Sequence, residues 1–307
     1  SLLYGFTGGT TFAGVATALA GDMSTGALFG LVFVLAGLAF KISAVPFHMW
    51  TPDVYEGAPT PVTAFFATAP KVAAVALTGR VALEVFGSQV EAWRQIVIFI
   101  ALASIVVGAL GAIGQSNIKR LLAFSSINNV GFILIGLAAA TVDGASAMLV
   151  YLWIYLAMSL GSFVAVLMLK DGDGQPVESI ASMAGMVREQ PLLAWCLFFL
   201  MLSLAGIPPL FGFWGKFVVF QAAVEADLIA LAALGIAASV IGAFYYLKVC
   251  KVIMFDESAG VITGKSNASH WAVLGITSLI ISPLGYLLTP SLGDLADKAA
   301  SALFMVN

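Results

Sequence analysis

Eight apolar runs follow one another along this sequence, and each reaches the length of about 20 residues that a helix needs to cross a bilayer. Hydrophobic residues make up 61% of the chain and charged residues only 9%, whereas soluble domains carry about 25% charged residues. The sequence therefore predicts an all-α, polytopic membrane helix bundle. We expect its spans at residues 25–50, 58–86, 92–115, 119–140, 145–169, 191–225, 227–254 and 271–289.

The whole chain, 1–307, is expected to form a single transmembrane domain, with all eight spans inside 25–289. Residues 1–20 read as the end of a preceding helix followed by a short interfacial segment, and 290–307 as a C-terminal tail with a second interfacial helix. The chain does not begin with Met and opens on the apolar run after Ser1, so we expect it to be the C-terminal part of a longer protein.

Three lysines, Lys41, Lys71 and Lys216, lie deep inside the expected spans. A charged side chain at the centre of a membrane helix costs about 2.5–3.5 kcal/mol on insertion scales. A lysine near a span end can reach the headgroups along its flexible stem, which suits Lys248 and Lys251 but not Lys71, near the middle of its span. Ionisable groups at membrane depth typically mark ion or proton pathways, and we expect these three lysines to carry protons.

Two spans are predicted to be discontinuous, and each break lies close to one of these lysines. Pro46 follows Lys41 by five residues, and proline removes a backbone donor and clashes with the preceding helical turn. The segment Gly206-Ile207-Pro208-Pro209 precedes Lys216 and cannot continue as regular helix. Because transporters place ion sites at such breaks, the breaks and the lysines point to the same places.

The first two expected spans form a hairpin that turns near Glu56. Lys41 lies fifteen residues before this turn and Lys71 fifteen residues after it, so both amines are expected at a similar depth, roughly 20 Å from the turn. Burial and a neighbouring positive charge both disfavour the ammonium form. The two lysines are therefore predicted to act as a coupled pair that loads and releases protons near neutral pH.

Several polar residues near the lysines are candidate accessory groups. His48, beside Trp50 near a span end, is more typical of interfacial packing than of proton transfer, although histidine titrates in a suitable range. Asp53 and Glu56 read as turn and capping residues that could also assist proton entry. Glu225 lies nine residues after Lys216, at the end of the span 191–225. This end is expected on the side of the membrane opposite Asp53 and Glu56, so Glu225 would receive a released proton.

A polar cluster interrupts the span 119–140. Hydrogen bonding between helices explains it about as well as a hydrated proton path does, and its members are Ser125, Ser126, Asn128 and Asn129. In the preceding span, three glycines are spaced for close helix packing: Gly108, Gly111 and Gly114.

Basic residues in the connections give the expected orientation, because cytoplasmic loops of membrane proteins are enriched in lysine and arginine. One side collects the turns near 51–57, 117–120, 170–190 and 248–270, and we predict that this side faces the cytoplasm. Its basic residues are Lys119, Arg120, Lys170, Arg188, Lys248, Lys251 and Lys265.

Other functions are disfavoured by what the sequence contains. The net charge of −3 has no patterning suited to nucleic acid. Cys196 and Cys250 lie far apart in apolar segments, whereas iron–sulfur and zinc sites need several closely spaced ligands. No glycine-rich loop follows a strand, as nucleotide binding would need. We therefore expect neither cofactor nor metal in this chain.

The chain resembles a known family along nearly its whole length. The most specific motif of the resemblance is Phe40-Lys41 with Pro46-Phe47-His48-Met49-Trp50-Thr51-Pro52-Asp53-Val54-Tyr55-Glu56-Gly57-Ala58-Pro59-Thr60-Pro61-Val62. Three further segments match in the same order: the Ala-Thr-Ala-Pro-Lys71 stretch, residues 115–122 and residues 202–217. These segments resemble the antiporter-like membrane subunits of bacterial proton-pumping NADH:quinone oxidoreductase, respiratory complex I. A lysine at position 216, where the M-type subunits have glutamate, favours the N-type.

The resemblance implies a fold of fourteen spans with inverted repeats, each containing a broken helix, of which this chain would hold the last eight. It places Lys41, Lys71 and Lys216 on a central hydrophilic axis. The glutamate that pairs with the first lysine in the family would lie outside this chain. Relatives often have histidine near Asn129, so a relay through that position would here need water or Lys71 itself.

The resemblance also implies the function and the partners. The chain would move protons across the bacterial inner membrane while NADH reduces quinone on other subunits, which would hold the flavin and the iron–sulfur clusters. Its partners would be other membrane subunits of complex I, including sister antiporter-like subunits, and the lipid bilayer, with no nucleic acid. The alternatives are a subunit of a multisubunit cation/proton antiporter, which shares the fold, and a purely structural membrane anchor.

Overall fold

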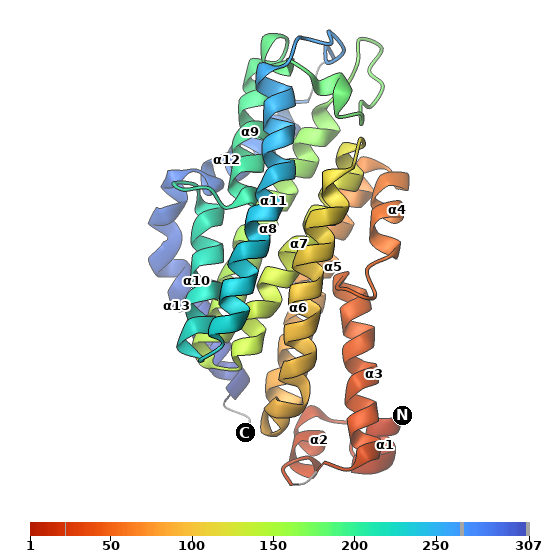
Figure 1. Ribbon diagram of the computed structural model, residues 1–307, viewed down its shortest axis with the longest axis vertical. Coiled ribbons are helices and arrows are strands. Elements are labelled where there is room, and N and C mark those ends of the chain that lie inside the picture. Colours follow the sequence, from red (N-terminus) through yellow and green to blue (C-terminus); the bar gives the residue numbers. More distant parts are fainter. Residues whose placement is uncertain (22, 265–266, 305–307) are drawn as a thin grey trace.

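The computed structural model describes residues 1–307 except 22, 265–266 and 305–307, so Lys265 and the last three residues of the expected tail lie outside the described residues. The described chain is an elongated helix bundle (Figure 1). Its α-helices are α1 (Leu2–Thr7), α2 (Phe12–Ala18), α3 (Thr25–Ile42), α4 (Trp50–Gly57), α5 (Thr60–Arg80), α6 (Val90–Ile113), α7 (Ile118–Ala139), α8 (Val142–Met168), α9 (Pro191–Ala205), α10 (Phe211–Glu225), α11 (Ile229–Phe255), α12 (Ala268–Ile281) and α13 (Thr289–Phe304).

Six of the described helical segments are long and apolar enough to cross a membrane, and two bent pairs raise the number to as many as eight. This confirms the expectation of a polytopic helix bundle. α5 continues past Arg80 as a π-helical turn over Val81–Val85.

Both predicted helix breaks are present. α3 ends at Ile42, where Ser43 adopts a left-handed conformation with φ 66°, and α4 begins only at Trp50. α9 ends at Ala205, where Gly206 has φ 83°, and α10 starts at Phe211. A left-handed residue at a helix end is strongly favoured as glycine, which explains Gly206. Pro46 and the Pro208-Pro209 pair lie within these two non-helical segments.

The last expected span, 271–289, was wrong in its extent. α12 ends at Ile281, and the chain bends by 71° into a 3₁₀ segment and then α13. Pro283 cannot continue the backbone hydrogen bonding of α12, and the Ser282 side chain caps the new segment by accepting a hydrogen bond from the Leu284 amide at 3.2 Å. The helix expected in the C-terminal tail is present as α13, and it packs along α8.

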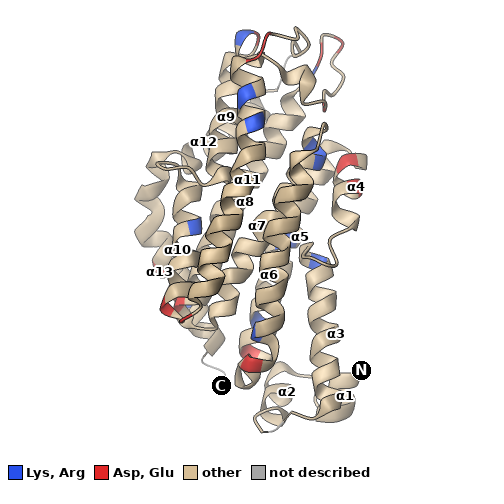
Figure 2. Ribbon diagram, in the orientation of Figure 1, with Lys and Arg blue, Asp and Glu red and all other residues tan. Residues whose placement is uncertain are grey.

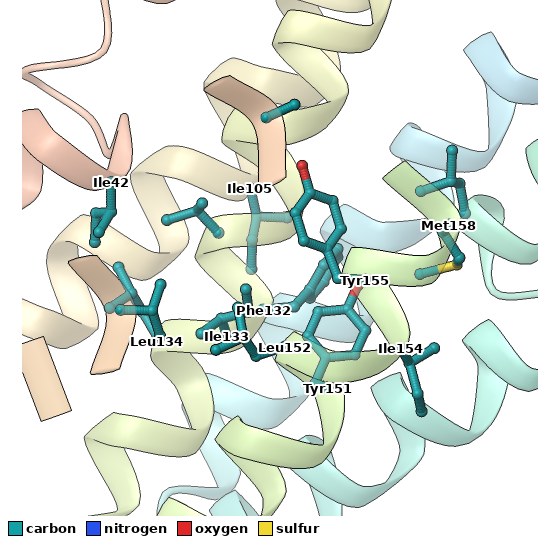
Figure 3. Packing of buried hydrophobic residues seen from close by; sticks show 14 of the residues in the cluster. Ile42, Ile105, Phe132, Ile133, Leu134, Tyr151, Leu152, Ile154, Tyr155 and Met158 are labelled. Atoms are coloured by element: carbon teal, nitrogen blue, oxygen red, sulfur yellow. The ribbon is translucent and has the colours of Figure 1, made fainter. Parts of the chain in front are cut away.

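Two helices form the centre of the bundle. In the window that would cross the bilayer, 94% of the residues of α7 and 78% of those of α8 are buried, against 39–44% for α3, α5, α6 and α11. Figure 3 shows part of the core between them, where the ring of Phe132 of α7 packs edge-on against Tyr151 of α8. Side chains at the middle of these two helices are consequently shielded from lipid.

The segments expected on one side of the membrane lie together at one end of the bundle. α4, the α6–α7 connection, the α8–α9 segment and the α11–α12 connection gather at the upper end of Figure 1, opposite the N-terminus and α2. Charged positions concentrate at the two ends, with isolated basic positions partway along α10 and at the end of α3 (Figure 2). The grouping of loops is as the orientation predicts.

α6 and α7 approach closely at glycines. A Cβ atom on Gly108 would lie 2.5 Å from the Asn128 amide nitrogen, and one on Gly111 would lie 2.4 Å from the ring of Phe124. The expected packing role is confirmed for these two residues, whereas Gly114 has open space around it. On the α7 side, Asn128 Nδ2 donates to the Ile105 carbonyl at 2.7 Å.

Replacing Gly108 by Ala is expected to destabilise the bundle by about 1–3 kcal/mol, because the new methyl group must displace backbone atoms of α7. The measurement is the midpoint of thermal unfolding of the detergent-solubilised protein. Gly114→Ala, directly after the end of α6, is the control, and its midpoint should stay near that of the parent. Equal midpoints for both variants would contradict the close packing described above.

Candidate functional site

Lys71 lies at the centre of the bundle in a pocket of hydroxyl groups. It is 3% exposed, and its Nζ donates a hydrogen bond to Ser126 Oγ of α7. The Tyr155 hydroxyl of α8 donates to the same oxygen at 2.9 Å, and the Tyr55 ring of α4 lies 5.9 Å from the amine. Among the described residues, this lysine forms no ion pair. A buried amine held by neutral oxygens can exist in either protonation state without breaking a salt bridge.

A second group of polar side chains continues from this site along α7. Asn129 accepts a hydrogen bond from the Tyr151 hydroxyl at 2.6 Å and donates to the Tyr246 hydroxyl at 3.1 Å. Tyr246 of α11 is also 2.5 Å from Ser125 Oγ. The predicted polar cluster thus hydrogen-bonds α7 to α8 and α11. These contacts satisfy helix–helix bonding and also form a polar connection through the core.

Lys216 lies against the α9–α10 break. It is 6% exposed, and its Nζ donates to the Ala205 carbonyl at 2.9 Å and to Ser239 Oγ of α11 at 3.2 Å. Ala205 ends α9, so its carbonyl has no partner inside that helix. The amine also lies 4.6 Å from the centre of the Phe132 ring, on the same helix as Asn129. The break therefore supplies a backbone acceptor for this lysine.

Two cavities adjoin at the far end of α10. The larger, 650 Å³ in volume, is lined by Lys216 and Ser239 at one end and by Gln221 and Glu225 at the other. The smaller, 240 Å³, is also lined by Gln221 and Glu225, together with Asp143 and Asp297. Glu225 therefore borders both cavities, and the structure connects it to Lys216 through one of them.

Lys41 is in a different environment from the other two lysines. Its side chain is exposed at the end of α3, and it makes no ion pair with any described residue. Lys71, in contrast, is fully enclosed by this chain. The coupling of the two amines stays a prediction, because the exposed face around Lys41 leaves room for a group from outside this chain.

The candidate accessory residues of α4 are engaged in ion pairs. Arg120, near the start of α7, contacts Asp53 at 2.5 Å and Glu56 at 2.9 Å. These pairs fix the end of α4 against α7. His48 lies in the α3–α4 break and is half-buried, with its Nδ1 buried and without a partner among the described residues.

Sequence reasoning missed one buried ion pair. Lys119, taken for a loop charge, is 2% exposed, and its Nζ lies 2.9 Å from Glu178 and donates to the Ala58 carbonyl at 2.7 Å. Both residues line a 380 Å³ cavity with Glu56 at the same end of the bundle. Lys119 was expected to be solvated because it lies at the start of a span. Glu178 reaches it only because the α8–α9 segment folds back over this end of the bundle.

The tyrosines and the serine that surround the lysines were also missed. Tyr55, Tyr151, Tyr155, Tyr246 and Ser239 lie in apolar or motif-rich segments, where aromatic residues usually mean packing. A signal did exist for three of them, because Tyr151 and Tyr155 lie one helical turn apart, and so do Thr51 and Tyr55.

Known proteins resemble this chain in sequence and in fold. A family model described as "NADH:quinone oxidoreductase/Mrp antiporter, TM" matches residues 1–242. NADH-quinone oxidoreductase subunit N of Erythrobacter litoralis is 72% identical over 307 residues, which cover 100% of this chain and 63% of the relative. The chain thus spans less than two thirds of the length of such relatives.

Two solved structures share the architecture. A chain of respiratory complex I from Thermus thermophilus with bound aureothin has a TM-score of 0.77 and 31% identity, over 95% of this chain and 64% of that one. A chain of the Mrp complex from a Dietzia species has a TM-score of 0.83 at 24% identity, over 99% and 64% respectively, and supports the fold alone. With the model match over 1–242, the chain belongs to the NADH:quinone oxidoreductase/Mrp antiporter transmembrane family.

Proposed function

We propose that this chain is the C-terminal part of an N-type, proton-translocating membrane subunit of NADH:quinone oxidoreductase in a bacterial inner membrane. The observation that carries the proposal is the pair of buried amines, Lys71 and Lys216, each hydrogen-bonded to neutral oxygens and free of ion pairs among the described residues. Buried charges in proteins are ordinarily paired, so a buried amine without an ion pair is suited to exchanging its proton.

Proton movement follows the polar groups of the core. Lys71 takes up a proton, which then passes from the Ser126 hydroxyl along the α7 side chains around Asn129 toward Lys216. Water would complete the steps between groups that are not in direct contact. Lys216 then releases it into the 650 Å³ cavity, where Glu225 receives it.

Lys41 acts through its charge. At an effective dielectric constant of about 20, a unit charge 8 Å away shifts the energy of a second charge by about 2 kcal/mol. A carboxylate outside this chain that alternately pairs with Lys41 and leaves it would change the proton affinity of Lys71 by a factor of about thirty. Proton loading would thereby respond to events in a neighbouring part of the complex.

The redox chemistry belongs to partner subunits in this proposal. NADH and quinone are substrates of the whole complex, flavin and iron–sulfur clusters reside on other chains, and this chain contributes to the enzyme as its translocating part. Its contacts are the lipid bilayer and other membrane subunits, including sister antiporter-like subunits. The 72% identity to a subunit N supports this assignment.

The composition of the purified complex tests the proposal. Affinity purification of the full-length, tagged subunit from its native membrane, followed by mass spectrometry, is expected to yield hydrophilic redox subunits together with the membrane subunits. A cation/proton antiporter, the second candidate suggested by the shared fold, would bring only small membrane proteins, and that result would refute the complex I assignment.

A further inference from the structure

The break between α3 and α4 concentrates buried side-chain atoms that lack hydrogen-bond partners. Among the described residues, Ser43 Oγ, His48 Nδ1, Thr51 Oγ1 and the Tyr55 hydroxyl are all buried and unpaired. Nearly all buried polar atoms in proteins are hydrogen-bonded, and leaving one unpaired costs about 1–3 kcal/mol. Such a concentration next to a buried lysine calls for a functional explanation.

Tyr55 is held firmly beside Lys71. It is 0% exposed, its ring lies 5.9 Å from the lysine amine, and the ring packs edge-on against Phe163 of α8 at 5.9 Å. Its carbonyl accepts a hydrogen bond from Thr63 Oγ1 at 3.0 Å. Arg120 binds the acids on both sides of it in sequence, so α4 cannot shift away easily. The phenol therefore occupies a fixed place in the Lys71 pocket.

The hydrogen bonds made by Ser126 limit the direction in which a proton can pass. Ser126 Oγ accepts from both Lys71 and Tyr155, which uses its two lone pairs. The Tyr55 hydroxyl has no hydrogen-bond partner among the described residues, and it cannot donate to this serine oxygen, whose lone pairs are both occupied. The Tyr55 proton is thus available for transfer toward a neutral Lys71 amine.

The N-terminal side of Tyr55 on α4 leads back to the α3–α4 break. Thr51 lies one helical turn earlier on the same face of α4, is 0% exposed and also lacks a partner among the described residues. Glu56 lines the 380 Å³ cavity with Lys119 and Glu178 at the opposite end of α4 from Thr51. Tyr55 therefore stands between the unpaired hydroxyl of Thr51, next to the α3–α4 break, and Lys71.

We propose that the Tyr55 hydroxyl delivers protons to Lys71, with Thr51 on its supply side. Tyr55 gives its O–H proton to the neutral amine while it accepts another from a water molecule bound by the Thr51 hydroxyl. Lys71 becomes an ammonium ion, the phenol ends neutral, and the water is reprotonated from the side of the α3–α4 break, where Ser43 Oγ and His48 Nδ1 are also unpaired among the described residues. The inference rests on the proposed function and adds the uptake step to it.

Tyr55→Phe tests the step, because it removes the hydroxyl and keeps the ring that packs on Phe163. In membrane vesicles with the full-length, assembled complex, we expect the rate of proton translocation to fall about tenfold or more. The solvent deuterium isotope effect on NADH oxidation should rise, because proton delivery then limits turnover. Assembly is checked by NADH oxidation with an artificial acceptor that bypasses the membrane part.

Two control variants separate chemistry from packing. Tyr286→Phe removes the hydroxyl of a half-buried tyrosine outside the Lys71 pocket, whose ring packs on Phe211 and Trp214, and should match the parent. Phe163→Leu loosens the Tyr55 ring but keeps its hydroxyl, and should leave the isotope effect unchanged. Thr51→Val, which keeps the side-chain shape, should show a smaller loss with a raised isotope effect, and it decides the matter if Tyr55→Phe does not assemble.

Several outcomes would overturn the inference. Parental translocation in Tyr55→Phe would do so, as would a loss accompanied by an unchanged isotope effect, since that indicates structural damage. If Lys71→Met stops translocation while Tyr55→Phe does not, only the uptake step fails and the proposed function stands. If neither variant affects translocation, the proposed function itself fails.

Discussion

Lys71→Met is expected to abolish proton translocation while the complex still assembles in the membrane. Methionine has nearly the same shape and lacks an ionisable group, so the pocket of Ser126, Tyr155 and Tyr55 can close around it without a buried charge. The rate of vesicle acidification during NADH oxidation should fall by at least about tenfold, which corresponds to about 1.4 kcal/mol in the barrier. Removal of a desolvated amine should leave thermal stability unchanged or raised.

The matched control is Lys251→Met. Lys251 lies near the end of α11, its side chain is 66% exposed, and it pairs with Asp256 at 2.6 Å. Surface ion pairs contribute little, so this variant should translocate protons like the parent. Normal acidification in Lys71→Met would favour the purely structural membrane anchor over a proton channel.

Lys216→Arg is expected to stop translocation even though the positive charge is kept. Arginine stays protonated, so it can replace a hydrogen-bond donor but cannot release a proton into the 650 Å³ cavity. We expect a loss of about tenfold or more in acidification rate, with electron transfer to an artificial acceptor unchanged. Glu225→Gln should give a smaller loss, because Asp143 and Asp297 border the adjoining cavity.

Lys216→Arg is informative because a purely structural role for Lys216 predicts the opposite result. If Lys216 only bonded the Ala205 carbonyl and Ser239 to hold the α9–α10 break, arginine would replace most of that bonding. Gly206→Ala serves as a test of the break itself, since a Cβ there would lie 2.8 Å from Lys216 Cδ. An assembled Lys216→Arg complex with full proton translocation would exclude the exit role.

The spans, the two helix breaks and the buried lysines could be predicted from the sequence because each depends on the chemistry of the residues themselves. Apolar length predicts spans whatever their neighbours are, and Pro46 and the Gly206–Pro209 segment disfavour helix through their own backbone chemistry. Lysines in such spans are conspicuous because their cost is intrinsic. The breaks and the buried state of Lys71 and Lys216 were therefore predictable from the sequence.

Features that depend on distant partners were not predictable. Lys119 is buried because the α8–α9 segment folds back and brings Glu178, and nothing near Lys119 in sequence announces this. Ser239 bonds Lys216 only because α11 packs beside α10. The bend after Ile281 was not predicted, because the hydropathy pattern of this region favoured one continuous span. The sequence also did not predict that Lys41 is exposed whereas Lys71 is buried, because a similar depth does not determine which side of a helix faces the core.

The burial of α7 on every side has a consequence for biogenesis. A ribosome delivers α6 and α7 to the insertion machinery before α8, α10 and α11 exist, so the serines and asparagines of α7 would at first meet lipid. The glycine-mediated contact with α6 and the bond from Asn128 to the Ile105 carbonyl give α7 one partner from the moment it leaves the translocon. The α6–α7 hairpin is thus the unit on which the later helices assemble, and damage to it should be seen as loss of the newly made subunit to quality-control proteases.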